Sequence, residues 1–373
     1  MFFIFTLIIF LFILSFLVLA HEFGHFIAAK KSGMMVEEFG IGYPPRIYSK
    51  KIGETKYSIN LLFFGGFVRL KDEETVPEKK SDRGYYAAKP RTKTKVLLAG
   101  VAANLLIAIV IYYIILIGQG FTFYSSSIGN RRMLFVDQTT LPMISQIMED
   151  SAASKSDLKQ YDAIISSGDT TFSSPESVIT FVSERPEQEI TFNVKNIISK
   201  DEKQVTVVPI LQEGKGFLGI GLGQILEVKY ITTAQKIFSG ITHSISTLDY
   251  SLRVLGGIIG SAFAEKSVKP LADTVVGPVG MFAITGAIID QGIWQILNFV
   301  AIISLGLGLI NILPIPAADG GKMIFVIYEA IFKKNAPEKF ERNFNFFGFL
   351  ILIGLSLAIA IKDYIQFFGK GKG

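Results

Sequence analysis

The side chains best suited to chemistry are in the segment His21-Glu22-Phe23-Gly24-His25. In a helix, two histidines four residues apart lie on one face about a turn apart, a spacing that suits two ligands of one zinc ion. The glutamate between them can take a proton from a metal-bound water. The segment therefore predicts a hydrolytic zinc site with Glu22 as the general base.

The composition indicates a protein that spans a membrane several times. Of 373 residues, 50% are hydrophobic, 18% are charged and none is cysteine. This balance is not typical of a soluble enzyme, and the absence of cysteine excludes disulfides, a thiol nucleophile and thiolate metal ligands. The net charge of +5 is small and its basic residues fall in loops, so no nucleic-acid partner is expected.

Four apolar stretches are long enough to cross a bilayer as helices, which takes roughly 17 to 25 residues. They are Phe2 to about Ala29, Val96 to Ile117, about Ile293 to Pro316, and Asn343 to Ile361. The first stretch lacks a basic start and exceeds the roughly 7 to 15 apolar residues of a signal peptide, so we expect it to be retained. Two shorter runs that contain glycine, 254–264 and 274–289, are expected to be interfacial or re-entrant.

The charges between these stretches predict the orientation. Residues 30–95 contain fifteen Lys or Arg and eight Asp or Glu, and residues 320–342 contain five and three. Residues 121–296 reverse the balance, with fourteen basic and eighteen acidic residues. Because basic loops stay in the cytoplasm, we expect both termini and the long central segment to be extracytoplasmic.

The position of the histidine motif inside an apolar stretch favours function over a surface histidine pair. An ionisable side chain there costs roughly 2.5 to 3.5 kcal/mol on insertion scales. Catalytic zinc usually takes three protein ligands, so a third is needed. Asp319 follows a charge-free run at the cytoplasmic end of the third stretch, where the alternative is a helix cap. His243 is a weaker candidate, and we expect it to be a surface or interfacial residue.

The segment Asn311-Ile312-Leu313-Pro314-Ile315-Pro316 leads to Asp319. Its prolines break a helix, and freed backbone groups at membrane depth are tolerated only next to protein or a water-filled cavity. Asn311 could hydrogen-bond a substrate carbonyl or a developing oxyanion, or it could hold helices together.

Residues 123–212 have the composition of a small soluble α+β domain. The runs 188–194 and 204–210 alternate like strands, and 174–183 predicts a helix in which Ser173 or Ser174 caps and Pro175 occupies the first turn. Residues 213–292 are expected to form a connector with membrane-surface segments, and 362–373 a tail.

The order of several motifs resembles the site-2 protease family of intramembrane zinc metalloproteases, in particular its bacterial RseP-like group. The motifs are His21 to His25, then 36–42 (VEEFGIG), then 65–68 (GGFV), and finally 311–321. The resemblance implies one zinc ion per chain on His21, His25 and Asp319, with Glu22 as general acid/base. It also implies that Asn311 and Pro314 lie near the bound peptide.

Two positions depart from the family's pattern. Ala318 stands where leucine usually precedes the aspartate, which alters packing beside the ligand and not the ligand itself. Val101 stands where relatives often have proline in the second stretch, and nearby Asn104 is expected to serve helix packing.

Residues 56–70 predict a β-hairpin in the cytoplasmic loop 31–95, with Gly65-Gly66 as a two-residue turn. Its apolar tip, 61–68, suits insertion into the membrane beside the zinc, as the resemblance implies, and the alternative is an ordinary cytoplasmic hairpin. An edge formed by Gly65, Gly66, Phe67 and Val68 could bind an extended substrate by strand addition.

The outer domain resembles a single PDZ module along 148–166, although Asp157 and Tyr161 replace two glycines of the family's stretch. It could bind peptides or exclude large substrates without a groove. The glycine-rich segment 217–223 predicts a connector that leaves this domain.

Together these features predict a multi-pass α-helical membrane protein with four transmembrane helices, a re-entrant β-hairpin and one extracytoplasmic PDZ-like α+β domain. The predicted function is hydrolysis of peptide bonds within single-span membrane proteins or peptides, such as anti-sigma factors or remnant signal peptides. We expect a monomer in the inner membrane of a bacterial cell. The alternatives are a metal transporter, which should place ligands at several depths, and a catalytically silent adaptor, which should lack a ligand or the base.

Overall fold

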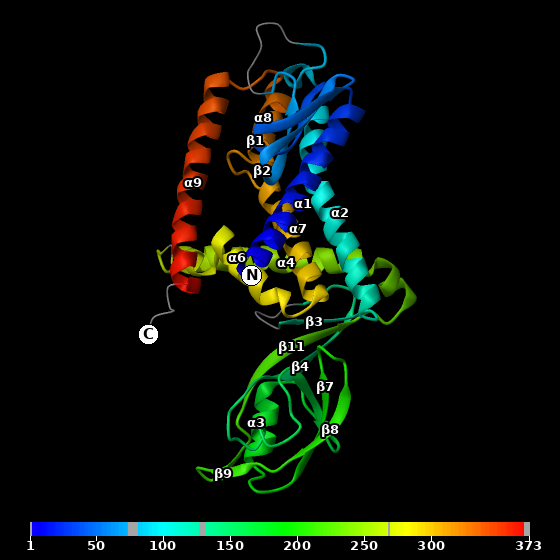
Figure 1. Ribbon diagram of the computed structural model, residues 1–373, viewed down its shortest axis with the longest axis vertical. Coiled ribbons are helices and arrows are strands. Elements are labelled where there is room, and N and C mark those ends of the chain that lie inside the picture. Colours follow the sequence, from blue (N-terminus) through cyan, green and yellow to red (C-terminus); the bar gives the residue numbers. More distant parts are fainter. Residues whose placement is uncertain (1, 74–80, 127–131, 268, 369–373) are drawn as a thin grey trace. The chain divides into compact units, whose positions relative to one another are not determined.

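A computed structural model describes residues 2–73, 81–126, 132–267 and 269–368. The chain divides into two compact units, which are considered separately: Met1–Ile115 with Thr247–Gly373, and Leu116–Ser246. Figure 1 labels the elements of both.

In the described part of the chain, four helices are long and apolar enough to cross a membrane, as predicted: α1 (Phe2–Lys31), α2 (Pro90–Gly118), α7 (Ile293–Ile312) and α9 (Glu338–Phe368). Helix α2 begins at Pro90, six residues before the predicted span, because proline suits the first turn of a helix. Many apolar side chains of α1 and α9 are exposed, which suits contact with lipid.

Helices α1 and α2 approach closely at two glycines. A Cβ atom at Gly24 would lie 2.4 Å from the carbonyl oxygen of Ala99. A Cβ atom at Gly100 would lie 2.6 Å from His25 Nε2 and 2.7 Å from His21 Nε2. Small residues therefore bring the α2 backbone against the histidines of α1.

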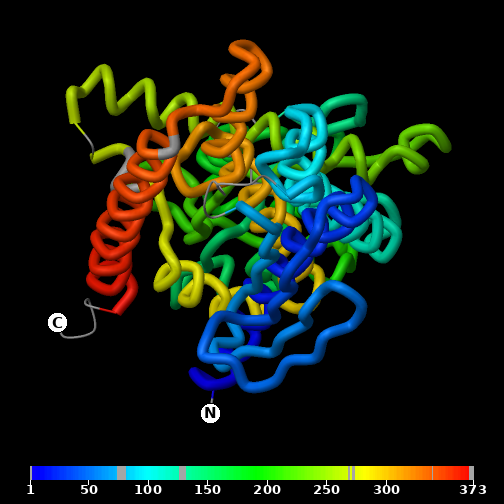
Figure 2. The backbone as a smooth tube through the Cα atoms, turned by 90° about the horizontal axis from the view of Figure 1, so that it is seen from above, coloured from blue at the N-terminus to red at the C-terminus, as the bar shows by residue number. Residues whose placement is uncertain are grey.

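Strands β1 (Val36–Ile52) and β2 (Thr55–Leu70) form a long antiparallel hairpin beside α1 (Figures 1 and 2). The predicted turn at Gly65-Gly66 is wrong: the strands are joined by Gly53-Glu54, and both glycines lie inside β2. A glycine pair can also mark a bend in a strand, where positive φ or close packing is needed. Gly65 has φ of +97°, and a Cβ atom at Gly66 would lie 2.6 Å from Leu19 Cδ2.

The bend lets the last part of β2 pair with β1 a second time. Residues 38–41 pair on one side with 66–69 and on the other side with 56–59. The end of β2, residues 66–70, therefore forms an edge of this sheet. The apolar segment 61–64 of β2 is exposed, and Ser15 Oγ of α1 donates a hydrogen bond of 2.6 Å to the carbonyl oxygen of Phe63.

The remaining helices of this unit complete it: part of α4 (Thr233–Ala264), then η1 (Tyr85–Ala87), α5 (Lys269–Thr274), α6 (Pro278–Ile289) and α8 (Asp319–Phe332). The apolar run 254–264, predicted as a separate short segment, is the end of the 32-residue helix α4. Helix α6 is a separate helix of 12 residues.

The second unit is built on an antiparallel sheet of strand order β3-β11-β4-β5-β7-β8, with β6 paired to β5. Its elements are β3 (Thr122–Ser126), β4 (Asp137–Ile147), β5 (Asp162–Ser167), β6 (Thr170–Thr171), α3 (Pro175–Ser183), β7 (Ile190–Asn196), β8 (Glu202–Val207), β9 (Ile210–Gln212), β10 (Lys215–Phe217) and β11 (Ile220–Lys229). Ser174 caps α3 as predicted, since its side chain accepts from Ser177 N.

Two predictions for this unit are wrong. Segment 217–223 does not leave the domain, because β11 begins at Ile220 and lies between β3 and β4 inside the sheet. Glycines at this density are typical of a linker, but Gly221 and Gly223 lie within a paired strand. His243 is not at the surface: it is fully buried, its ring packs on Phe123, and the hydroxyl of Tyr230 lies 2.9 Å from its Nδ1.

Candidate metal centre

Three potential ligand atoms converge inside the first unit. His21 Nε2 lies 2.9 Å and His25 Nε2 3.0 Å from Asp319 Oδ2, and the two Nε2 atoms are 3.0 Å apart. Zinc binds histidine nitrogen and carboxylate oxygen at about 2.0 to 2.2 Å, so one ion fits among donors at this spacing. The donor set of two histidines and one carboxylate is also typical of hydrolytic zinc sites.

The sequence explains how these side chains meet. The histidines lie on one face of α1, where both are buried. Helix α7 ends at Ile312, before Pro314, and α8 begins at Asp319, so the link between the two helices is only six residues long. Glycines after Asp319 allow this link to pack tightly, since a Cβ atom at Gly321 would lie 2.4 Å from the carbonyl oxygen of Ile315.

The other ring nitrogens of the histidines have partners of their own. His25 Nδ1 donates a hydrogen bond of 2.8 Å to the carbonyl oxygen of Val96, which leaves Nε2 available to a metal. The Asn104 amide lies 3.4 Å from His21 Nδ1 through its Nδ2, while its buried Oδ1 has no partner among the described residues. With this amide rotated by 180°, Oδ1 would accept from Nδ1–H and leave Nε2 of His21 to the metal. The surroundings therefore fit zinc at both histidines.

Glu22 belongs to the same cluster as the histidines, with ligand atoms of His21, Glu22 and His25 all within 4.8 Å of one another. Its Oε2 accepts a hydrogen bond of 3.0 Å from the backbone amide of Val68. The general-base candidate is thus held against the edge of β2 at residues 66–70.

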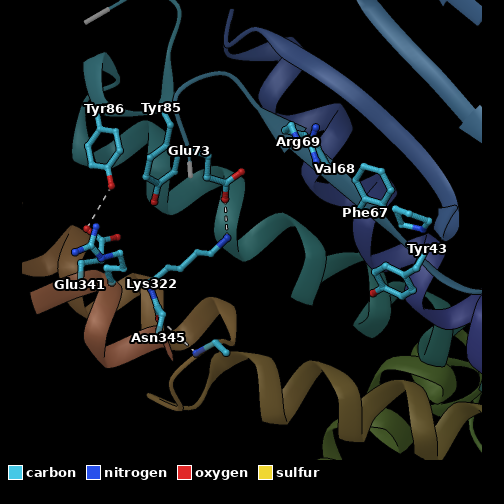
Figure 3. A pocket seen from close by; sticks show the side chains of 13 residues that line it. Tyr43, Phe67, Val68, Arg69, Glu73, Tyr85, Tyr86, Lys322, Glu341 and Asn345 are labelled. Carbon is cyan, nitrogen blue, oxygen red and sulfur yellow. Dashed lines mark hydrogen bonds and ion pairs between the residues drawn. The ribbon is translucent and has the colours of Figure 1, made fainter. Parts of the chain in front are cut away.

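Two cavities are lined by residues of this centre, and a third lies beside the hairpin. One of about 280 Å³ is lined by Glu22, Asp319, Asn311, Asn104 and Lys322, among others. A second of about 200 Å³ brings Glu22, His25 and Asp319 together with Gly66, Phe67 and Val68. A third, of about 600 Å³ and drawn in Figure 3, lies between the hairpin, Tyr85, Tyr86 and the start of α9.

The predicted site residues are therefore mostly, but not all, close to the centre. Asn311 and residues 66–68 line its cavities, whereas Pro314 is exposed and neither Pro314 nor Gly65 lines any of the three cavities. Gly65 instead packs near Tyr43 and Val18. Gly100, Glu73 and Lys322 also lie at or beside the centre and are not predicted from the sequence, and Asn104, predicted to serve helix packing, contacts His21. The only sequence signal for Lys322 is its place one turn after Asp319.

A chain with four helices able to span a membrane and a histidine–glutamate–histidine cluster facing an aspartate defines a membrane-embedded metallohydrolase. Residues 9–355 match the model of peptidase family M50, and the chain belongs to this family, the site-2 proteases.

Relatives in other bacteria align along nearly the whole chain. A protein of Clostridium perfringens is 30% identical over 94% of this chain and 96% of its own length. Zinc metalloprotease RasP of Geobacillus kaustophilus is 26% identical over 97% of this chain and 98% of its own. Regulator of sigma-W protease RasP of Bacillus subtilis is 26% identical over 97% of this chain and 99% of its own length. The chain is accordingly a zinc metalloprotease and a bacterial membrane protein.

Proposed function

We propose that this zinc metalloprotease hydrolyses peptide bonds within or near the transmembrane segments of single-span membrane proteins. The observation that carries the proposal is the convergence of His21, Glu22 and His25 of the apolar helix α1 with Asp319, the first residue of α8. Ligands gathered at one depth suit a catalytic centre better than a transport path.

In this proposal His21, His25 and Asp319 hold one zinc ion. Bound zinc supplies a water of lowered pKa and polarises the scissile carbonyl. Glu22 takes the proton of the attacking water and passes it to the leaving amine. Asn311, across the same cavity from Glu22, hydrogen-bonds the substrate backbone or the developing oxyanion.

The substrate binds in an extended form along residues 66–68 of β2. A helical substrate hides its amides, whereas an exposed strand edge offers backbone partners to an unwound segment. The edge position of 66–70 and the cavity that joins it to Glu22 support this arrangement. The exposed apolar segment 61–64 supports insertion of this end of the hairpin into the membrane. We expect Gly66→Pro to abolish cleavage, and unchanged cleavage would argue against strand addition.

The second unit acts outside the cytoplasm as a single PDZ-like domain that filters or binds substrates. Among the described residues, β11 pairs with β4 along 220–229 and with β3 along 225–229, so it lies inside the sheet of this domain. Anti-sigma factors are candidate substrates because one relative is named a regulator of sigma-W protease, and remnant signal peptides are a further class.

The test is cleavage of a panel of single-span peptides by the purified protein. We expect cleavage by the wild type that stops when zinc is chelated and returns when zinc is restored. The variant Glu22→Gln should bind zinc as the wild type does and cut at least about a thousandfold more slowly, since it lacks the base. Undiminished cleavage by this variant would remove Glu22 from the reaction and contradict the mechanism.

A further inference from the structure

Glu73 connects two parts of the first unit that are distant in sequence. Its Oε1 accepts a hydrogen bond of 2.6 Å from Lys322 Nζ on α8, the pair drawn in Figure 3. Its Oε2 accepts from the backbone amide of Leu70, at 3.4 Å, at the end of β2. One carboxylate therefore ties the end of β2 to helix α8.

The Leu70 amide belongs to the same strand edge as the amide that binds Glu22. Backbone amides of a strand point alternately to its two sides, so the N–H groups of Val68 and Leu70 share one side. Val68 N donates to Glu22 and Leu70 N donates to Glu73. The edge at 66–70 is thus held at two points, one at the general base and one at Glu73.

Lys322 links this edge to the metal centre. It lies three residues after Asp319 on α8, which places both side chains on neighbouring positions of one helical face. Lys322 also lines all three cavities, the two that contain Glu22 and the larger one in Figure 3. The Lys322–Glu73 ion pair therefore connects helix α8, which begins at the ligand candidate Asp319, to the strand edge at 66–70.

We propose that Glu73 and Lys322 are positioning residues that fix the register in which a substrate strand pairs with the 66–70 edge. This inference rests on the proposed function, in which that edge binds substrate. A strand that slips by two residues keeps its side chains on the same faces, so edge pairing alone does not select one bond. An edge held at one distance from Asp319 presents a single carbonyl of a paired substrate to the metal, whereas an edge free to move along the substrate also presents carbonyls two residues away.

The experiment compares the cleavage positions of Glu73→Gln and Lys322→Met with those of the wild type, by mass spectrometry of the products from one single-span peptide. We expect one main bond to be cut by the wild type and additional bonds two residues away to be cut by each variant. We also expect kcat/KM at the main bond to fall by roughly 10- to 100-fold, as small misplacements of reacting groups do. The double variant should be no worse than either single variant, because both remove one interaction.

A matched control is available in the same unit. Lys93 of α2 and Glu329 of α8 form another ion pair of 2.6 Å. This pair also involves α8, but it does not include a hydrogen bond to the 66–70 edge. Lys93→Met should leave the cleavage position unchanged. The proposal is contradicted if Glu73→Gln and Lys322→Met cut the wild-type bond alone at the wild-type rate, or if Lys93→Met shifts the position equally.

A second readout does not require turnover. The chain has no cysteine, so Phe67→Cys in a Glu22→Gln background is a unique site for disulfide cross-linking to substrate peptides that carry single cysteines. We expect cross-linking to peak at one peptide position and to spread to positions two residues away when Glu73→Gln is added. An unchanged single peak would contradict the register role. Absence of zinc-dependent cleavage by the wild type would instead contradict the proposed function, and the cross-linking would still test the register.

Discussion

At the scale of single residues, the centre also depends on a residue that does no chemistry. Gly100 has no side chain, and this absence gives the two zinc-ligand candidates room, since the nearest heavy atoms to a Cβ there would be His25 Nε2 at 2.6 Å and His21 Cε1 at 2.7 Å. Real Cβ atoms do not approach other atoms so closely, so any other residue must displace an imidazole. The geometry of the metal centre therefore requires glycine at position 100.

We therefore expect Gly100→Ala to lower zinc occupancy and to reduce cleavage at least tenfold, because tilted imidazoles bind the metal poorly. Metal content of the purified variant, measured by mass spectrometry, checks this directly. Gly306→Ala in α7 is the control, since a Cβ atom there would have no neighbour within 4 Å. Full zinc occupancy in Gly100→Ala would show that the histidines tolerate the methyl group.

At the scale of elements, single polar contacts hold the helices and the hairpin in place. Asp363 near the end of α9 is fully buried, and its Oδ2 accepts hydrogen bonds from the amides of Gly277 and Gly280, at 2.8 and 2.9 Å, at the start of α6. A carboxylate satisfies free amides at a helix N-terminus and favours its positive dipole end. This contact ties the last helix to α6.

Replacing Asp363 by alanine should destabilise the protein by about 1 to 3 kcal/mol for each buried amide left without an acceptor. The melting temperature in detergent is the measurement. Asp249→Ala removes an exposed ion pair with Arg253 on α4 and should have almost no effect. Equal melting temperatures for both variants would mean that α9 is held mainly by its apolar contacts.

The hairpin turn gives a prediction for pH. Arg83 and Lys30 bind Glu54 between β1 and β2, and they lower the pKa of its carboxyl from the usual 4.5 to about 2. A lowered pKa stabilises the folded protein above about pH 4.5, and this stabilisation is lost as the pH falls toward 2. The Glu54 side chain is partly exposed, so salt should weaken the effect.

Melting temperatures of the wild type and Glu54→Gln, measured at low salt from pH 6 to pH 3, test this pH dependence of stability. The difference in favour of the wild type should be small at pH 6 and should shrink steadily below about pH 4.5. A difference that stayed constant across this range would mean that the charge of Glu54 contributes nothing to folding.

At the scale of the whole molecule, local patterns were enough to predict some parts and not others. The zinc-ligand candidates and the four apolar helices could be predicted because helical spacing and hydrophobic length are local properties. The hairpin turn could not be predicted, because two adjacent glycines are a local turn signal. Only the pairing of β2 with β1 shows that Gly65 and Gly66 lie inside a strand. The place of β11 in its sheet likewise depends on pairing with β4, more than seventy residues earlier in the chain. Asn104 could not be assigned to the centre because only helix packing brings it to His21.

The orientation in the membrane also belongs to this scale, and the charge balance of the loops predicts it. The loop between α8 and α9 should be cytoplasmic and the second unit extracytoplasmic, because the short basic loop carries the orienting charge. Lys334 of that loop and Ser199 of the second unit are both exposed, and the chain has no cysteine. In intact bacterial cells whose outer layer admits the reagent, Ser199→Cys should react with a membrane-impermeant maleimide. Lys334→Cys should react only after the inner membrane is opened, and the reverse pattern would place the metal centre's ligands at the opposite face.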